Sequence, residues 1–74
     1  MAKTVLDFKG MACPMPVIKL TMAIRKAAIG DVFEIVSDDP GFEPDIQAWC
    51  KETDHVLSSL TKSDKDIIAT VTKK

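Results

Sequence analysis

The pattern of apolar and polar positions along this 74-residue chain predicts six elements of secondary structure. Four short runs rich in β-branched residues predict strands at residues 4–8, 32–36, 55–61 and 67–72. Two longer stretches have apolar residues at helical spacing, and they predict helices that begin near Cys13 and Glu43. Residues 62–66 between the last two strands predict a hairpin loop. The predicted element order is therefore β-α-β-α-β-β.

The first predicted helix extends to Ala28 and carries a stripe of apolar residues on one side. The stripe is formed by Val17, Leu20, Ile24 and Ala27. Ile18 and Met22 are expected to widen this stripe, and Gly30 is expected to act as the C-terminal cap. A solvated edge is expected from Lys19, Arg25 and Lys26. This helix is predicted to pack on the sheet through a broad apolar face.

The second predicted helix covers residues 43–53 and also has one apolar face. That face is formed by Phe42, Ile46, Trp49 and Cys50. Because Cys50 lies in this set, its position favours core packing over a role as a resolving thiol. His55 follows the helix, and we interpret it as a surface or strand-capping residue in preference to a catalytic base.

The element order predicts an α+β fold, a two-layer α/β sandwich with a four-stranded mixed sheet. The first β-α-β unit implies a right-handed crossover between parallel strands. In a chain of this length, both helices are expected to cover one face of the sheet. The polar residues of the last two strands indicate that the other face is solvated. No repeat or linker divides the sequence, so residues 1–74 are expected to form one domain.

Composition narrows the function classes. The formal net charge is -1, with 46% hydrophobic and 28% charged residues, which disfavours disorder and a basic surface for nucleic acid. The apolar runs are too short to span a membrane. The two cysteines, Cys13 and Cys50, do not make the disulfide framework typical of small secreted domains. We therefore expect a protein of the reducing cytoplasm.

The run Cys13-Pro14-Met15-Pro16 is the candidate chemical motif. Proline is tolerated in a first helical turn because the N–H groups there have no intrahelical partner. The two prolines remove donors, so the N–H of Met15 is the expected contact of a Cys13 thiolate. Positive charge at a helix N-terminus favours the thiolate and lowers its pKa. Cys13 is thus predicted to be a reactive sulfur, positioned by Pro14, Met15 and Pro16.

The residues that carry a family resemblance occur in order along nearly the whole chain. They are Leu6-Asp7, Gly10, Cys13-Pro14-x-Pro16, Gly30-Asp31, Asp39-Pro40, Asp45-Ile46 and His55. In this set the chain resembles the TusA (SirA-like) family of small sulfur carriers. The resemblance implies the same β-α-β-α-β-β sandwich, and it implies that Cys13 carries sulfur as a persulfide. It also points to tRNA thiolation, molybdenum-cofactor enzymes or sulfur oxidation as the pathway.

The resemblance further implies partner proteins. The donor would be a cysteine desulfurase, a rhodanese or a DsrE-type sulfurtransferase, and a separate protein would accept the sulfur. We expect a covalent carrier without independent turnover, cofactor or metal, which is a monomer or weak dimer and binds neither nucleic acid nor membrane directly. The sequence leaves open the donor, the acceptor, the pathway, and whether the cargo is a persulfide or a thiosulfonate.

Two positions depart from the family pattern. Many members have a polar or basic residue before the cysteine, where this chain has Ala12. Many have glycine before the histidine, where this chain has Asp54. Because Ala12 carries no charge, the expected activation of Cys13 shifts from a neighbouring cation to the helix terminus.

Residues around the motif supply candidate contacts for an anion or a partner. They are Lys9, Lys19, Arg25 and Met11, with Lys19 preferred among the cations. Exposed Met11 or Met15 would offer an adaptable apolar contact, whereas one of the two is alternatively expected to pack inward.

Two other hypotheses about the function of the motif stay open. One is a regulatory or interaction module without sulfur chemistry. The other is a thiol redox protein that uses Cys13 and Cys50. A metal site of Cys13, Cys50 and His55 has suitable ligand types but lacks ligand spacing.

Overall fold

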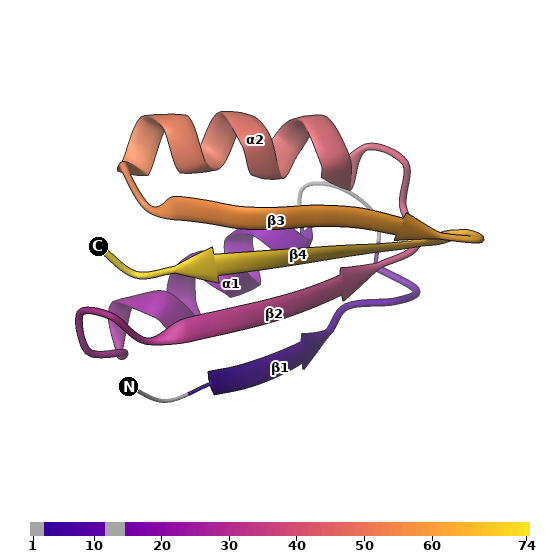
Figure 1. The fold of residues 1–74 in the computed structure, drawn as a ribbon. Helices are drawn as coiled ribbons and strands as arrows, with labels where there is room; N and C mark the ends of the chain where they lie inside the picture. The colour runs from indigo at the N-terminus through magenta and orange to yellow at the C-terminus, as the bar shows by residue number, and fades with distance from the viewer. Residues whose placement is uncertain (1–2, 12–14) are drawn as a thin grey trace.

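The computed structural model describes residues 3–11 and 15–74, which form the predicted six elements in the predicted order. The elements are β1 (Lys3–Asp7), α1 (Met15–Arg25), β2 (Val32–Ser37), α2 (Phe42–Thr53), β3 (Val56–Ser63) and β4 (Asp66–Thr72), shown in Figure 1. Neither helix in these residues is long and apolar enough to cross a membrane.

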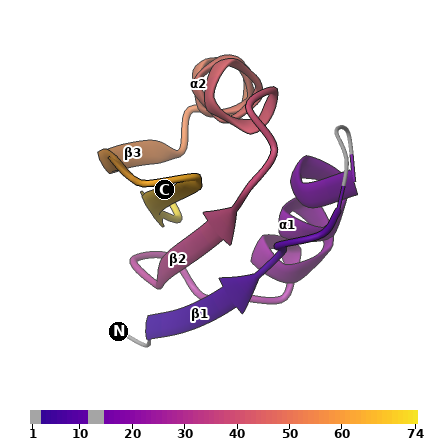
Figure 2. The ribbon, with the colours of Figure 1, turned by 90° about the vertical axis from the view of Figure 1, so that its right-hand side faces the viewer.

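The four strands of the described residues form one mixed sheet in the order β1-β2-β4-β3. β1 pairs with β2 in parallel, as the β-α-β unit requires, while β4 pairs antiparallel with both β2 and β3. Figure 2 shows α1 and α2 side by side on the same face of this sheet. The structure therefore confirms the predicted two-layer α+β sandwich.

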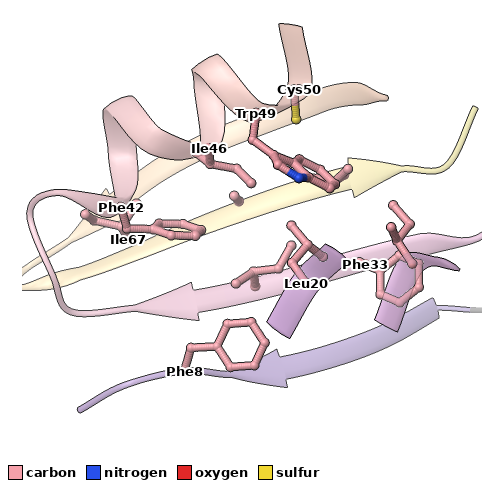
Figure 3. Close-up of a cluster of buried hydrophobic side chains, with 12 residues drawn as sticks. Phe8, Leu20, Phe33, Phe42, Ile46, Trp49, Cys50 and Ile67 are labelled. Carbon is pink, nitrogen blue, oxygen red and sulfur yellow. The ribbon is translucent and has the colours of Figure 1, made fainter. Parts of the chain in front are cut away.

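The core lies between the helices and one face of the sheet (Figure 3). Alternate residues of the two central strands point into it: Phe33, Ile35 and Ser37 from β2, with Ile67, Ala69 and Val71 from β4. The helices contribute Leu20, Ile24, Phe42, Ile46, Trp49 and Cys50. Burying a large apolar side chain stabilises a fold by about 1.5–3 kcal/mol. The predicted inward face of α2 is confirmed in full.

No helix of the described residues covers the opposite face of the sheet. Lys3 and Glu34 form an exposed ion pair there at 3.5 Å, and Ser58 and Thr72 lie 3.4 Å apart through their hydroxyl oxygens. Val5, also on this face, is 59% exposed. The prediction of a solvated outer face is confirmed.

The prediction for α1 was wrong at two positions. Ile18 and Met22 are not part of the buried stripe; they are 45% and 59% exposed. Successive residues turn by about 100° around a helix axis, so both side chains lie about 160° from that of Leu20. Pro16 is buried in their place. Ile18 and Met22 therefore form an apolar surface directed away from the sheet.

The end of α1 also differs from the prediction. The helix ends at Arg25, and the N–H groups of Lys26 and Ala27 donate to the oxygens of Ala23 and Ile24, three residues back. These hydrogen bonds, which reach three residues back as in a 3₁₀-helix, replace the α-helical bonds to the fourth residue back. Gly30 does have a positive φ of 93°, but its N–H donates to the oxygen of Lys73, so it joins the chain end instead of capping the helix.

The hairpin between β3 and β4 is shorter than the predicted five-residue loop. Ser63 pairs with Asp66, which leaves a two-residue turn at Asp64 and Lys65. Asp64 has a φ of 58°, and aspartate tolerates this left-handed conformation in tight hairpin turns. β3 begins at Val56, so His55 precedes the strand instead of opening it.

Candidate functional site

Described residues on both sides of the motif place the candidate site at one end of the sheet. After β1, the N–H of Phe8 donates to the oxygen of Val36 at 2.8 Å, and the N–H of Met11 donates to the oxygen of Phe8 at 3.1 Å. The chain resumes with α1 at Met15. Cys13 and Pro14 lie outside the described residues, so the predicted contact between the Cys13 thiolate and the Met15 N–H stays a prediction.

An acidic side chain anchors the loop that leads to the motif. The Asp38 carboxylate, just after β2, accepts a hydrogen bond from the Gly10 N–H at 3.0 Å. Gly10 has a φ of 87°, and a Cβ added to it would meet no atom of residues 3–11 and 15–74 within 4 Å. Glycine is therefore favoured by backbone conformation and not by lack of space. The sequence gives no local signal for this contact, because Gly10 and Asp38 are 28 positions apart along the chain.

The first turn of α1 is well suited to an anion. Met15 opens the helix and Pro16 is the second residue, as expected for proline where an N–H needs no partner. No acidic residue lies in this turn, so no side chain there offsets the positive end of the helix dipole. Met15 is 43% exposed, whereas Met11 packs against the core. The expectation that one of the two methionines packs inward is therefore confirmed, and it is Met11.

A pair of side-chain hydrogen bonds braces α1 against α2. The indole N–H of Trp49 donates to the Thr21 hydroxyl at 2.9 Å, and this hydroxyl donates to the oxygen of Val17 at 2.8 Å. Hydrogen bonding of the Trp49 indole satisfies a polar group in a largely buried ring. The brace joins the middle of α1 to α2, and the sequence pattern did not reveal it.

The candidate cations differ in their ion pairing and in their distance from the motif. The Lys9 ammonium lies 3.9 Å from the Asp66 carboxylate, an exposed ion pair of small energetic value. Lys19 is exposed one turn into α1. Arg25 ends the helix, about 15 Å along the axis from Met15 at 1.5 Å per residue. Lys19 thus remains near the motif end of the helix, whereas Arg25 lies at the far end.

Cys50 and His55 lie away from the motif end of the sheet. Figure 3 shows Cys50 near one end of α2 and Phe42, which follows the motif end of β2, near the other. Cys50 is buried, and its burial raises the pKa of the thiol to about 11. The predicted core packing of Cys50 is confirmed, and such a thiol is a poor nucleophile at neutral pH.

His55 is held by structural contacts. Its ring lies 5.3 Å from that of Trp49, and its Nδ1 accepts a hydrogen bond from the backbone N–H of Lys74 at 3.1 Å. It precedes Val56, whose partner Thr72 is at the end of β4 opposite to the motif. These contacts agree with the interpretation of His55 as a strand-capping residue.

Comparison with known proteins gives a consistent family assignment. Residues 4–73 match the family model described as "Sulfurtransferase TusA". Three relatives share the name "Putative sulfur carrier protein": one from Aquifex aeolicus (40% identical over 92% of this chain), YrkF from Bacillus subtilis (44% over 73%) and NMA0882 from Neisseria meningitidis (34% over 80%).

The relatives differ in length. The aligned part covers 80% of the Neisseria protein but only 34% of the Aquifex protein and 29% of YrkF. The chain therefore spans about a third of the length of those two relatives. Among solved structures, the SirA-like protein of Desulfitobacterium hafniense has the same fold, with a TM-score of 0.80 at 23% identity over 93% of this chain and 95% of that one.

Proposed function

The chain belongs to the TusA family of sulfurtransferases, and from this premise we propose that it carries sulfane sulfur as a persulfide on Cys13. The observation that carries the proposal is the family match across residues 4–73, which includes the cysteine between β1 and α1. The resemblance seen in the sequence is thereby confirmed at the level of the family. The relatives named as sulfur carriers support the same role.

The proposed transfer is a displacement at sulfur with no net oxidation. The Cys13 thiolate attacks the terminal sulfur of a donor persulfide and forms a new S–S bond with it. The donor's own S–S bond breaks, and the donor sulfur leaves with the electron pair as a thiolate. The proton of the donor persulfide stays with the transferred sulfur or is lost to water. The second transfer repeats this step, with an acceptor thiolate as nucleophile and Cys13 as the leaving group.

The residues around the motif favour both steps. The N-terminal end of α1, without an acidic residue in its first turn, favours a thiolate or a persulfide anion nearby. The hydrogen bond from Gly10 to Asp38 and the Thr21–Trp49 brace hold the two sides of the motif on fixed elements. Exposure of Met15 leaves the beginning of the helix open to a partner. Pro14, Met15 and Pro16 are proposed as positioning residues.

The proposal requires two kinds of partner protein. A cysteine desulfurase, a rhodanese or a DsrE-type sulfurtransferase would supply the sulfur, and a protein of tRNA thiolation, molybdenum-cofactor synthesis or sulfur oxidation would accept it. A reducing cytoplasm would keep Cys13 as a thiol between transfers. We propose that residues 1–74 act as one carrier domain, monomeric or weakly dimeric, without turnover of its own.

Intact-mass analysis tests the proposal. Reduced protein is incubated with glutathione persulfide, thiosulfate or tetrathionate, and the mass is compared for wild type, Cys13→Ser and Cys50→Ser. We expect an adduct on wild type and on the matched control Cys50→Ser, and none on Cys13→Ser. A persulfide and a thiosulfonate differ in mass, so the cargo is identified in the same spectrum.

Two results would contradict the carrier function. Absence of any adduct on wild type would favour a binding module without sulfur chemistry. A loss of two hydrogens, caused by a bond between Cys13 and Cys50, would favour a redox protein.

A further inference from the structure

The outer side of α1 is unusual because it is apolar and basic together. Met15, Ile18 and Met22 are 43%, 45% and 59% exposed. The exposed basic residues beside them are Lys19, Arg25 and Lys26. We call these six residues the α1 outer face. Monomeric proteins rarely leave grouped large apolar side chains in water without a function.

The helical geometry places these residues together. At 100° per residue, Met15, Ile18 and Met22 lie within about 60° of one another around the axis. Lys19 lies on one side of this apolar stripe and Arg25 on the other, within a total arc of about 120°. The stripe begins at Met15, two residues after Cys13, so it adjoins the proposed sulfur site.

The charge of this region has one sign. Residues 8–30 include four basic side chains and no acidic one, although acidic residues outnumber basic ones in the whole chain. Ion pairs among the described residues use Lys3, Lys9 and Lys62. Lys19, Arg25 and Lys26 form none there, so their charges are available to an approaching molecule.

We propose that the α1 outer face docks a sulfur-relay partner protein whose surface presents apolar side chains bordered by carboxylates. The proposal rests on the carrier function of Cys13 and adds the place and chemistry of the partner contact. Apolar contact would supply most of the affinity, and the flexible methionines can adapt to more than one partner. The three cations would select acidic surfaces and accelerate the encounter.

Charge also argues against a second copy of this chain as the occupant. In a twofold-symmetric contact the same patch faces itself, so three cations would oppose three cations. Like charges brought together at an interface are costly. An acidic partner removes this repulsion.

Binding is tested without sulfur chemistry, on the full chain with Cys13→Ser. The probes are two synthetic amphipathic helical peptides that share a leucine face and differ only in flanking glutamates or lysines. Affinities come from NMR titration of isotope-labelled protein. We expect the acidic peptide to bind at least tenfold more tightly, with shifts centred on residues 15–26. Lys19→Glu with Arg25→Glu should reverse this preference, whereas the control Lys51→Glu, an exposed change on α2, should preserve it.

Several outcomes would overturn the proposal. They are equal affinity for both peptides, shifts centred on α2 or on the uncovered sheet face, and self-association through α1 in the absence of peptide. Tighter binding to phosphatidylglycerol vesicles than to the acidic peptide would identify a membrane surface instead.

Sulfur transfer provides a second test that separates docking from the carrier function. Cys13 is loaded either by glutathione persulfide or by a cysteine desulfurase supplied with cysteine. Ile18→Gln with Met22→Gln should raise the half-saturating desulfurase concentration about tenfold and leave loading by the small persulfide unchanged. Ile29→Gln is the control, because Ile29 is 79% exposed but lies outside the face. If wild type is not loaded by glutathione persulfide, the carrier function fails, while the peptide titration still decides on docking.

Discussion

The two helices cover the same face of one sheet but differ in what they show to solvent. α2 buries Phe42, Ile46, Trp49 and Cys50, and its exposed positions are mostly polar or charged. α1 buries Leu20 and Ile24 but leaves Met15, Ile18 and Met22 exposed among basic residues. Both helices are of similar length, 11 and 12 residues.

From this difference we infer that α2 serves the fold, whereas α1 is the helix proposed to dock a partner. α2 is an ordinary amphipathic helix, and its large hydrophobic side chains are buried in the core. α1 has more apolar residues than one face can bury, so its surplus lies on the outside, next to the motif. The following predictions test this division, from the largest expected effect to the smallest.

Truncation of a buried residue on α2 should destabilise the protein far more than truncation of an exposed residue on α1. Phe42→Ala should lower the free energy of unfolding by about 3–5 kcal/mol, because the Phe42 side chain is only 1% exposed. Met22→Ala should stay within about 0.5 kcal/mol of wild type, because the side chain is already in water. Urea unfolding measures both changes in the free energy of unfolding, provided that the m-value is the same in the variants and the wild type. If Met22→Ala were destabilising by more than 1 kcal/mol, the stripe on α1 would belong to the fold.

The buried thiol on α2 should make stability fall at alkaline pH. Burial raises the pKa of Cys50 from 9.0 to about 11, so the folded state holds the proton more tightly than the unfolded state. The resulting stabilisation is complete below pH 9 and is lost as pH rises through 11, with a full size on the order of 2–3 kcal/mol.

The measurement is urea unfolding between pH 8 and 10.5, with Cys13→Ser as the background. Adding Cys50→Ala should flatten the pH dependence of the free energy of unfolding, since the titrating thiol is gone. If the free energy still fell with pH as steeply as before, Cys50 would not titrate differently in the folded and unfolded states. Iodoacetamide at neutral pH should also modify Cys13 well before Cys50.

A glycine at position 54, the C-terminal cap of α2, should stabilise the protein. Asp54 caps the helix with a φ of 64°, a left-handed conformation that glycine adopts without steric cost. Asp54→Gly should therefore stabilise the protein by about 0.5–1 kcal/mol, a rise in Tm of several degrees for a chain of this size. Asp54→Val should have the opposite effect. Calorimetry measures both, and a lower Tm for Asp54→Gly would mean that the aspartate makes a contact that offsets its backbone strain.

Much of the fold could be read from the sequence because its signals are local. Runs rich in β-branched residues and apolar residues at helical spacing predicted the order of elements. The resemblance implies a glycine before the histidine in many members, and the left-handed backbone of Asp54 gives this preference a physical explanation. The resemblance also pointed to Cys13, whose own geometry stays a prediction.

Other features had no local signal. The Gly10–Asp38 and Thr21–Trp49 hydrogen bonds each join residues 28 positions apart. The five-residue hairpin loop was wrong because strand pairing continued to Ser63 and Asp66, leaving a tighter turn.

The sequence by itself determined that a cysteine precedes an apolar, acid-free helix after the first strand. The apolar spacing also predicted the side of the helix that meets the sheet, through Leu20 and Ile24. Only the tertiary structure decided how wide that buried side is, because the sheet and α2 together cover only part of a helix that has apolar residues on several sides. This packing buries Leu20 and Ile24 and leaves Ile18 and Met22 in water. The same packing turns Met11 inward and Met15 outward, and so exposes the apolar surface beside the proposed sulfur site.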